Sequence, residues 1–222
     1  MWGSFTHSQK DLLAHLHSRI NLSERVKNAL LTIDRGDFCP KNPYFDGAQA
    51  IGYNATISAP HMHAMALEYL SEKLVNGAHV LDIGSGSGYL TACMAKMVGG
   101  TGKVVGIEHI QGLVDLSIEN VLKNHRDLIE SGTLKIVQGD GRLGYPQEAP
   151  YNAIHVGAAA QQVPEALFEQ LAIGGRMVIP VGGKNGQEFM QYDKISADKI
   201  EKKRLFGVIY VPLTSQAEQL GQ

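Results

Sequence analysis

The chain has few cysteines and no long apolar run. Cys39 and Cys93 are its only cysteines among 222 residues, too few for a disulfide framework, and no CxxC or paired Cys/His spacing indicates a structural zinc site. No run approaches the roughly 18 apolar residues needed to cross a bilayer, and the first ten residues lack the apolar core of a secretory signal. We therefore expect a soluble, cytosolic protein with reduced thiols and no membrane partner.

An excess of basic charge is also absent. The 20 Lys and Arg against 22 Asp and Glu give a formal net charge of -2. Affinity for nucleic acid or for an acidic membrane surface depends on a basic field, so we expect neither partner. A composition of 44% hydrophobic and 19% charged residues is near the globular average. Since no linker, repeat or exposed apolar stripe is evident, we expect residues 1–222 to form a single domain that is monomeric.

The order of the hydrophobic patterns predicts an α/β fold. Two helical patterns begin after the cap residues Ser8 and Ser23, and a long ordered loop follows at 37–60, a length that is usually functional. Strand and helix patterns then alternate, which is typical of a parallel sheet with crossover helices on both faces. The expected strands are 80–83, 104–107, 134–137, 153–156 and 177–181, and the expected helices are 61–74, 90–98 and 113–122.

The helical patterns stop beyond Gly183. Segments 189–192 and 205–211 have the character of a terminal antiparallel strand pair, joined by the charged stretch 193–204. We therefore predict a doubly wound, mostly parallel, seven-stranded Rossmann-like sheet with N-terminal helices and a C-terminal antiparallel strand pair.

The strongest local signal is a buried strand that runs into glycines and opens a helix, at 80–88. Glycines let a ligand approach the backbone, and a helix N-terminus offers unpaired N–H groups. A dinucleotide fingerprint would place its last glycine where Tyr89 stands. Asp82 would repel a pyrophosphate but favour a cationic ligand. S-adenosyl-L-methionine carries a sulfonium, an ammonium and no phosphate, and we expect it to bind here at Gly84, Ser85 and Gly86.

Two further carboxylates follow the next two strands. Glu108 ends the second strand, where a carboxylate can accept hydrogen bonds from both ribose hydroxyls. Asp140 follows the third strand, at the height of the adenine edge, and Gly141 permits the turn. Open parallel sheets bind ligands at the carboxyl ends of their strands. The sequence thus predicts one S-adenosylmethionine site, with S-adenosyl-L-homocysteine as product, that contains Asp82, Glu108 and Asp140.

Motifs that the sequence lacks restrict the chemical class of the methyl acceptor. Amine methylation typically uses an Asn-Pro-Pro-Tyr-like turn after the fourth strand, where this chain reads Val-Gly-Ala-Ala-Ala at 156–160. Catechol-type transfer needs a metal held by carboxylates; none cluster there, and the pair His61 and His63 has no third ligand, so we expect no metal. A carboxylate acceptor, with a pKa of roughly 3.3 to 4.3, is already ionised at pH 7 and needs no base.

Three segments resemble a known family. They are IGYNATISAPHMHA at 51–64, LDIGSGSGY at 81–89 and YNAIHVGAA at 151–159. Together they closely resemble the protein-L-isoaspartate (D-aspartate) O-methyltransferases, especially the animal cytosolic enzymes, and the resemblance extends to 207–214. The first segment is highly specific, whereas the glycine turn alone indicates only the class I methyltransferase superfamily.

The resemblance implies methyl transfer from S-adenosylmethionine to the free α-carboxyl of L-isoaspartyl residues, and to the side-chain carboxyl of D-aspartyl residues, in damaged proteins and peptides. The product ester would return to aspartyl through a succinimide. By resemblance Ser58 is the active-site residue; its hydroxyl suits orientation of a carboxylate better than attack, because no His-Asp pair is evident to activate it. The other cofactor contacts that the resemblance implies are Ala55, Thr56, Ile57, His63, His109, Thr214 and Gln219. The expected walls of the peptide site are Tyr53, Ile57, Ser58, Val211, Pro212 and Leu213.

Departures and alternatives remain. The family often reads Asp-Ser-Pro-Gln where this chain reads Asp-Gly-Ala-Gln at 46–49, so we expect altered loop mobility or peptide preference; Asn152 also stands where Asp is common. A nicotinamide-dependent dehydrogenase is the competing enzyme class, favoured by the glycine turn and Glu108. A non-catalytic module that keeps the cofactor fold is the second alternative.

Overall fold

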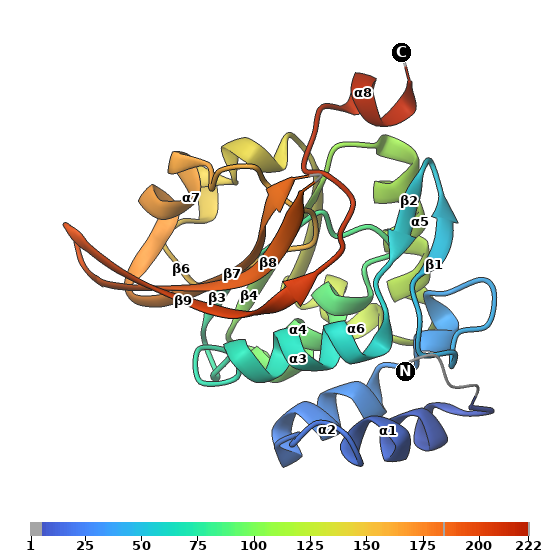
Figure 1. The fold of residues 1–222 in the computed structure, drawn as a ribbon. Coiled ribbons are helices and arrows are strands. Elements are labelled where there is room, and N and C mark those ends of the chain that lie inside the picture. The colour runs from blue at the N-terminus through green and yellow to red at the C-terminus, as the bar shows by residue number, and fades with distance from the viewer. Residues whose placement is uncertain (1–5, 184, 222) are drawn as a thin grey trace.

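A mostly parallel sheet forms the centre of the molecule in the computed structural model, which describes residues 6–183 and 185–221 (Figure 1). Its strand order is β5-β4-β3-β6-β7-β8-β9, and the pairs from β5 to β7 are parallel while β7, β8 and β9 pair antiparallel. The bounds are β3 His79–Ile83, β4 Lys103–Glu108, β5 Leu134–Gln138, β6 Tyr151–Val156, β7 Leu171–Gly183, β8 Gly186–Ser196 and β9 Lys199–Val208. The predicted fold class is confirmed.

Helices cover both faces of this sheet. They are α1 Gln9–His17, α2 Glu24–Thr32, α3 Pro60–Leu70, α4 Tyr89–Val98, α5 Gln111–Asn124, α6 Arg126–Glu130, α7 Glu165–Gln170 and α8 Gln216–Leu220. Figure 1 shows α3 and α4 below the sheet, α1 and α2 beneath them, and α7 on the opposite side. The short helices α6, α7 and α8 are absent from the sequence prediction, because five or six residues are too few to show a helical period.

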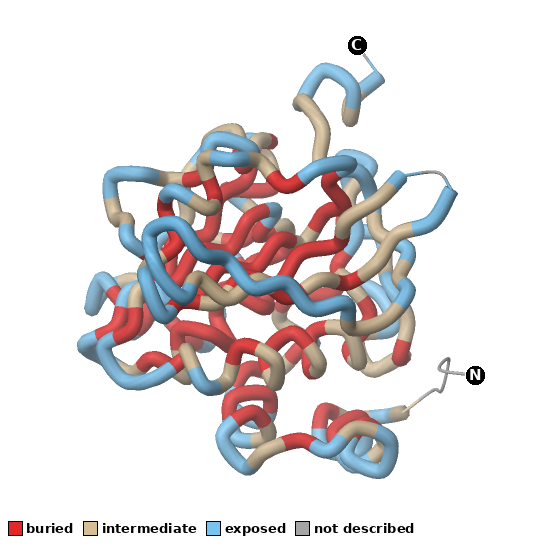
Figure 2. Tube along the Cα trace, turned by 60° about the vertical axis from the view of Figure 1, so that its left-hand side comes forward, coloured by how far each residue is buried: buried red, intermediate tan, exposed pale blue. Residues whose placement is uncertain are grey.

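The core has two layers, one on each face of the sheet. Successive residues of a strand point to opposite faces, so Val80 packs with the N-terminal helices and α4, whereas Leu81 packs with α7. The same alternation holds for Val104 and Val105 on the neighbouring strand. Figure 2 shows these strand centres buried inside an exposed outer layer.

The expected loop at 37–60 contains a small hairpin. Strands β1 Gln49–Gly52 and β2 Ala55–Ile57 pair antiparallel, joined by Tyr53 and Asn54 with φ of 52° and 56°. Two positive φ angles are the geometry of a type I′ hairpin turn. The hairpin escapes sequence analysis because its strands are short, its register shifts between Ala50 and Gly52, and tyrosine rarely adopts this conformation.

The charged stretch 193–204 is part of the sheet, so the prediction that it is a connecting segment is wrong. Asp193 pairs with Glu201 and Lys194 with Ile200, and the two strands join in a tight turn. Charged side chains fit there because β9 is an edge strand, where lysines discourage pairing with other chains. In the part of the chain that the structure describes, no helix has the length and apolarity needed to cross a membrane.

Candidate active site

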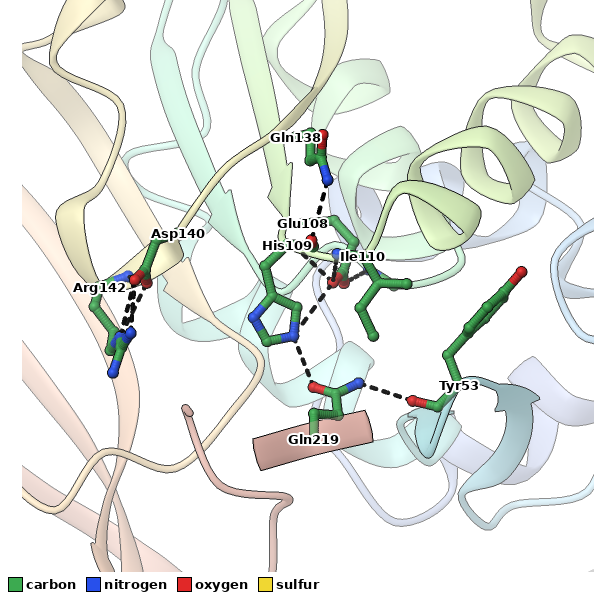
Figure 3. Close-up of polar contacts among 9 residues, drawn as sticks. Tyr53, Glu108, His109, Ile110, Gln138, Asp140, Arg142 and Gln219 are labelled. Carbon is green, nitrogen blue, oxygen red and sulfur yellow. Dashed lines mark hydrogen bonds and ion pairs between the residues drawn. The ribbon is translucent and has the colours of Figure 1, made fainter. Parts of the chain in front are cut away.

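The glycine turn and Glu108 form one unit at the carboxyl ends of β3 and β4. The Glu108 carboxylate is buried and accepts hydrogen bonds from the N–H groups of Gly86 at 3.2 Å, His109 at 2.8 Å and Ile110 at 3.2 Å. Figure 3 shows the last two of these contacts around its carboxylate. Gly84 and Gly86 have φ of 73° and 52°, which glycine adopts without strain. Glu108 thus fixes the glycine turn. It also lines the cavity that lies beside this turn.

Asp82 of β3 is held by two protein side chains. Its side chain is buried, and its oxygens bind the Thr91 hydroxyl at 2.6 Å and the His155 Nδ1 at 2.7 Å. His155 stands beside Asp82 in the register of β6 against β3. The carboxylate is therefore held by two protein partners, and it also lines a small polar cavity at the carboxyl ends of the strands.

Asp140 is similarly engaged. Arg142 grips its carboxylate through Nε at 3.0 and 3.1 Å and through Nη2 at 2.7 Å, and these hydrogen bonds lower the pKa of Asp140 (Figure 3). Asp140 lies with His109 and Gln138 in a shallow hollow beside the main cavity. Gly141 does reach the cavity wall, where an added Cβ would lie 2.4 Å from Ile83 Cγ2, so no larger residue fits there without displacing Ile83.

The C-terminal helix α8 is bonded to the hairpin turn between β1 and β2 (Figure 3). The Gln219 amide donates from Nε2 to the Tyr53 carbonyl at 3.0 Å and accepts at Oε1 from His109 Nε2 at 2.8 Å. The Asn54 side chain donates to the Gln219 carbonyl at 2.9 Å. Residues separated by about 165 positions in the sequence thus meet, and because Gln219 Nε2 is the donor, its Oε1 must accept and His109 must donate.

These elements enclose a cavity of about 580 Å³, counting its open side. The predicted residues in its wall are Ala55, Thr56, Gly84, Gly86, Glu108, His109, Gly141, Val211, Pro212, Leu213, Thr214 and Gln219. We name it the cofactor cavity.

A smaller polar cavity adjoins the cofactor cavity. Its wall contains the predicted residues Ile57, Ser58, His63, Asp82 and Ser85, together with Ser87, Leu90 and His155, which sequence analysis missed. The Ser85 hydroxyl is buried and has no hydrogen-bond partner among the described residues. An orphaned hydroxyl on a cavity wall calls for a polar ligand group, so the residues present fit the polar amino-acid end of S-adenosylmethionine.

His63 is fully buried in the wall of that polar cavity. Its Nδ1 lies 3.2 Å from Arg35 Nη1, and because a guanidinium can only donate, Nδ1 accepts and the ring proton sits on Nε2. Burial, and then the charge of Arg35, lower the pKa of His63 well below its usual value. The imidazole is therefore neutral near pH 7.

Arg35 is the main residue that sequence analysis missed. It is fully buried, donates from Nη2 to the Ser58 carbonyl at 2.8 Å, and lies over the Tyr89 ring at 5.4 Å. A single arginine beside a helix end carries no sequence pattern that distinguishes it from a surface charge. Its importance appears only once the fold buries it.

An apolar groove opens on the other side of Ser58. Its wall is formed mainly by apolar residues of α3, the segment before β1, the end of β9 and the chain that follows β9. Among them are Ala48, Met62, Met65, Phe206, Val208, Ile209 and Val211. The polar side chains on its wall belong to Thr56, Ser58, His61, Gln187 and Tyr210. We name it the peptide groove.

The predicted peptide-site residues divide between the cavities. Ser58 and Val211 line the peptide groove, but Pro212 and Leu213 line the cofactor cavity and Ile57 lines the polar cavity. Tyr53 lies outside the groove: its side chain is 51% exposed and its hydroxyl end packs beside Gly112 of α5. Tyr53 is therefore not among the residues that line this groove, because the hairpin turn points its side chain toward α5.

The three cavities meet at one point. Thr56 and Gly157 line all of them, and Ser58 lines both the polar cavity and the peptide groove. A group bound in the cofactor cavity would therefore lie next to a group bound in the groove, with Ser58 on the wall that the polar cavity shares with the groove.

The comparisons with known proteins decide which reaction this arrangement serves. The family model described as protein-L-isoaspartate(D-aspartate) O-methyltransferase matches residues 7–218. The chain belongs to this family. A protein-L-isoaspartate O-methyltransferase of Caenorhabditis elegans is 56% identical over 98% of this chain and 97% of its own length, and one of Triticum aestivum is 52% identical over 89% and 87%.

A solved structure agrees with the family assignment. A protein-L-isoaspartate O-methyltransferase from Plasmodium falciparum, in complex with S-adenosyl-L-homocysteine, is 36% identical, has a TM-score of 0.88, and is covered over 99% of its chain by 94% of this one. The enzyme is thus an S-adenosylmethionine-dependent methyltransferase that acts on isoaspartyl residues of proteins. The dehydrogenase and the non-catalytic module that the sequence left open are both wrong.

Proposed function

We propose that the cofactor and polar cavities hold S-adenosylmethionine, that the peptide groove holds the damaged chain, and that Ser58 orients the reacting carboxylate where they meet. The observation that carries this proposal is that Thr56 and Gly157 line all three cavities and that Ser58 lines both the polar cavity and the peptide groove. Transfer of a methyl group needs donor and acceptor in line and in contact, which one common boundary provides.

The residues around the cofactor cavity suit the parts of that molecule. Each oxygen of the Glu108 carboxylate has more than one acceptor position, so it can bind ribose hydroxyls while it holds the backbone. The orphaned Ser85 hydroxyl and the neutral His63 suit the polar amino-acid end. His109, Gly141, Thr214 and Gln219 would surround the adenosine, and the α8 contact with the hairpin turn would exclude water from it.

The chemistry asks little acid–base work of the protein. When bound, S-adenosylmethionine supplies an electrophilic methyl group: the carboxylate oxygen bonds to the methyl carbon while the carbon–sulfur bond breaks and its electron pair stays on sulfur. No proton moves, so no general base is required. The apolar wall of Met62 and Met65 replaces bulk water around the carboxylate, and the Ser58 hydroxyl can donate one hydrogen bond that fixes its direction.

The product of the proposed reaction is a methyl ester that can return to normal aspartate. Methylation of the free α-carboxyl of an isoaspartyl residue makes a better leaving group for succinimide closure, and hydrolysis then returns some normal aspartate. We further propose that the enzyme works as a cytosolic monomer on flexible peptide segments, without nucleic acid or membrane partners. The net charge of -2 and the two buried, reduced cysteines, Cys39 and Cys93, support this.

The test is methyl transfer from labelled S-adenosylmethionine to a synthetic peptide with L-isoaspartate, beside the same peptide with normal aspartate. We expect base-labile label on the first peptide alone. Ser58→Ala should lower kcat by about 10-fold or more while cofactor affinity stays unchanged, since one hydrogen bond to a charged group contributes about 1.5–3 kcal/mol. Label on neither peptide, with cofactor binding intact, would refute the substrate assignment.

A further inference from the structure

Two histidines line the polar cavity, one bound to a cation and the other to an anion. His63 comes from α3 and His155 from β6. The guanidinium of Arg35 lies 3.2 Å from the Nδ1 of His63, whereas the carboxylate of Asp82 lies 2.7 Å from the Nδ1 of His155. All four side chains are buried. The cavity thus has a positive charge behind one imidazole and a negative charge behind the other.

These charged partners give the two rings opposite tautomers. A guanidinium can only donate, so the Nδ1 of His63 accepts and its ring proton is on Nε2. An ionised carboxylate can only accept, so the Nδ1 of His155 donates to Asp82 and the Nε2 of the neutral ring carries no proton. One imidazole therefore has a donor at Nε2, and the other has an acceptor.

The two Nε2 atoms are available to a ligand. Neither has a hydrogen-bond partner among the described residues, and neither is one of the enclosed polar atoms that lack a partner. The outer edge of the His155 ring lies beside Gly157, since a Cβ added to that glycine would be 3.5 Å from His155 Cε1. Gly157 lines all three cavities. A ligand in the polar cavity can therefore meet both nitrogens.

Each charged partner is held by a second contact. The Arg35 guanidinium also donates from Nη2 to the Ser58 carbonyl at 2.8 Å. The second oxygen of the Asp82 carboxylate accepts from the Thr91 hydroxyl at 2.6 Å. Neither partner can turn away from its histidine without losing this other hydrogen bond, so the donor and the acceptor keep their places before a ligand arrives.

A donor backed by a cation and an acceptor backed by an anion match the two charged groups of an α-amino acid. Its carboxylate accepts hydrogen bonds and is favoured by the charge of Arg35, whereas its ammonium donates and is favoured by the charge of Asp82. The unpartnered Ser85 hydroxyl is a further polar group on the same wall. S-adenosylmethionine and S-adenosylhomocysteine both end in such an amino acid.

We propose that His63 and His155 together bind the amino-acid end of the cofactor, with the His63 Nε2–H donating to its carboxylate and the His155 Nε2 accepting from its ammonium. This inference rests on the placement of S-adenosylmethionine proposed above. Arg35 and Asp82 act through the two rings as positioning residues, because they set which ring donates and which accepts. A reversed amino-acid end would bring donor to donor and acceptor to acceptor, so the pair fixes the direction in which the cofactor binds.

Nitrogen NMR of the ¹⁵N-histidine-labelled enzyme tests the tautomers, because imidazole nitrogens with and without a proton have well-separated shifts. The signals are assigned from their loss in His63→Gln and His155→Gln. We expect the proton of His63 on Nε2 and that of His155 on Nδ1. Arg35→Met should release the His63 tautomer and leave His155 unchanged. The same tautomer in both rings, or a doubly protonated ring, would overturn the inference.

The second experiment compares the affinities for S-adenosylhomocysteine and for two truncated analogues, one without the carboxylate and one without the amino group. The wild type should bind each analogue about 10-fold or more weakly, the size of one hydrogen bond to a charged group. In His63→Leu, removing the carboxylate should have little further effect, while removing the amino group still weakens binding about 10-fold. His155→Leu should show the opposite pattern.

The ratio of two affinities of one variant does not depend on how much of the sample is folded, so a destabilised variant still gives an answer. His63→Gln, whose amide can donate from near the Nε2 position, should restore the carboxylate ratio. His79→Leu is the matched control. His79 begins β3, lies 3.4 Å through its Nδ1 from the Glu148 carbonyl and lines none of the three cavities, so both wild-type ratios should remain.

The outcomes distinguish this inference from the proposed function. If the wild type binds S-adenosylhomocysteine and both analogues equally well, the polar cavity does not hold the amino-acid end, and the proposed placement of the cofactor fails as well. If the wild type distinguishes the analogues but His63→Leu and His155→Leu keep its ratios, or show each other's pattern, only the histidine pair is overturned.

Discussion

The cofactor cavity and the peptide groove share a boundary but are built from different parts of the chain. The cavity lies at the carboxyl ends of parallel strands, and Glu108 on its wall is held by backbone N–H groups. Asp82 and Asp140, in the hollows beside it, are also held by protein partners. The groove is formed by α3, the β1–β2 hairpin with the segment before it, and the end of β9 with the chain that follows, with mainly apolar side chains. The cofactor cavity thus offers fixed polar contacts, whereas the peptide groove offers an apolar surface of flexible side chains.

This difference matches what each site has to recognise. A cofactor is always the same molecule, so fixed hydrogen bonds on rigid strands give selectivity. Damaged peptides share only a carboxylate and a backbone, so Met62 and Met65, whose side chains are flexible and polarizable, can accommodate different neighbours. The comparison predicts that changes in the cavity act on cofactor affinity and changes in the groove act on peptide KM.

The largest effect is expected for Glu108→Ala. It removes a carboxylate that ties Gly86 to the end of β4 and that we assign to the ribose. The loss of two charged hydrogen bonds to the ligand, about 3 kcal/mol, corresponds to about 100-fold weaker binding. Isothermal titration with S-adenosylhomocysteine measures it, with Glu119→Ala on the exposed side of α5 as control. Equal affinity in both variants would show that the cavity is not where the cofactor binds.

The next effect concerns pH and the buried His63. Because its pKa in the folded state is lowered, the unfolded chain binds a proton below pH 6.5 that the folded chain does not. The free energy of unfolding should therefore fall as pH falls below 6.5, by up to about 1.4 kcal/mol per pH unit, and this contribution disappears above it.

Urea unfolding at pH 7, 6 and 5 measures this slope. Burial also lowers the pKa of His125, so the wild-type slope contains both residues, and the difference between wild type and His63→Asn isolates His63. Exposed His17→Asn is the control and should keep the wild-type slope. The same slope in His63→Asn would mean that the polar cavity contributes nothing to the acid sensitivity.

A smaller effect is expected in the groove. Met65→Gln places an amide on an apolar wall and removes about 1 kcal/mol of favourable burial, so KM for the isoaspartyl peptide should rise about 5-fold. Cofactor affinity should not change. If Met65→Gln weakens the cofactor as much as the peptide, the two sites are not separable in the way that their construction indicates. Initial rates at varied peptide and varied cofactor concentrations distinguish these results.

The smallest effect is expected for Ala48→Pro, which introduces the proline that the family resemblance leads us to expect at this position. Ala48 lines the groove immediately before β1. A fixed φ reduces the freedom of the segment in the unbound enzyme by about 0.4–1 kcal/mol, so peptide KM should change by about 2- to 5-fold with kcat unchanged. An unchanged KM across several peptides would show that this segment does not contribute to preference.

Hydrophobic period and turn chemistry were sufficient to predict much of the fold and half of the site. The alternation of apolar strands and amphipathic helices specifies the parallel sheet, and parallel strands bring Glu108 and the glycine turn to the same edge. The C-terminal antiparallel pair was predicted, but the full length of β8 and β9 was missed because charged residues fill their middle. The short helices and the β1–β2 hairpin were missed because so few residues show no period.

The sequence by itself determined the strands of the parallel sheet, the glycine turn and the candidate serine. Each of these depends on residues within one segment. Only the tertiary structure decided that Arg35 holds the Ser58 main chain, that His155 and Thr91 engage Asp82, and that Tyr53 turns toward α5. Burial and hydrogen bonding are properties of residues that meet in space, and a side chain's charge, partner and direction follow from that meeting.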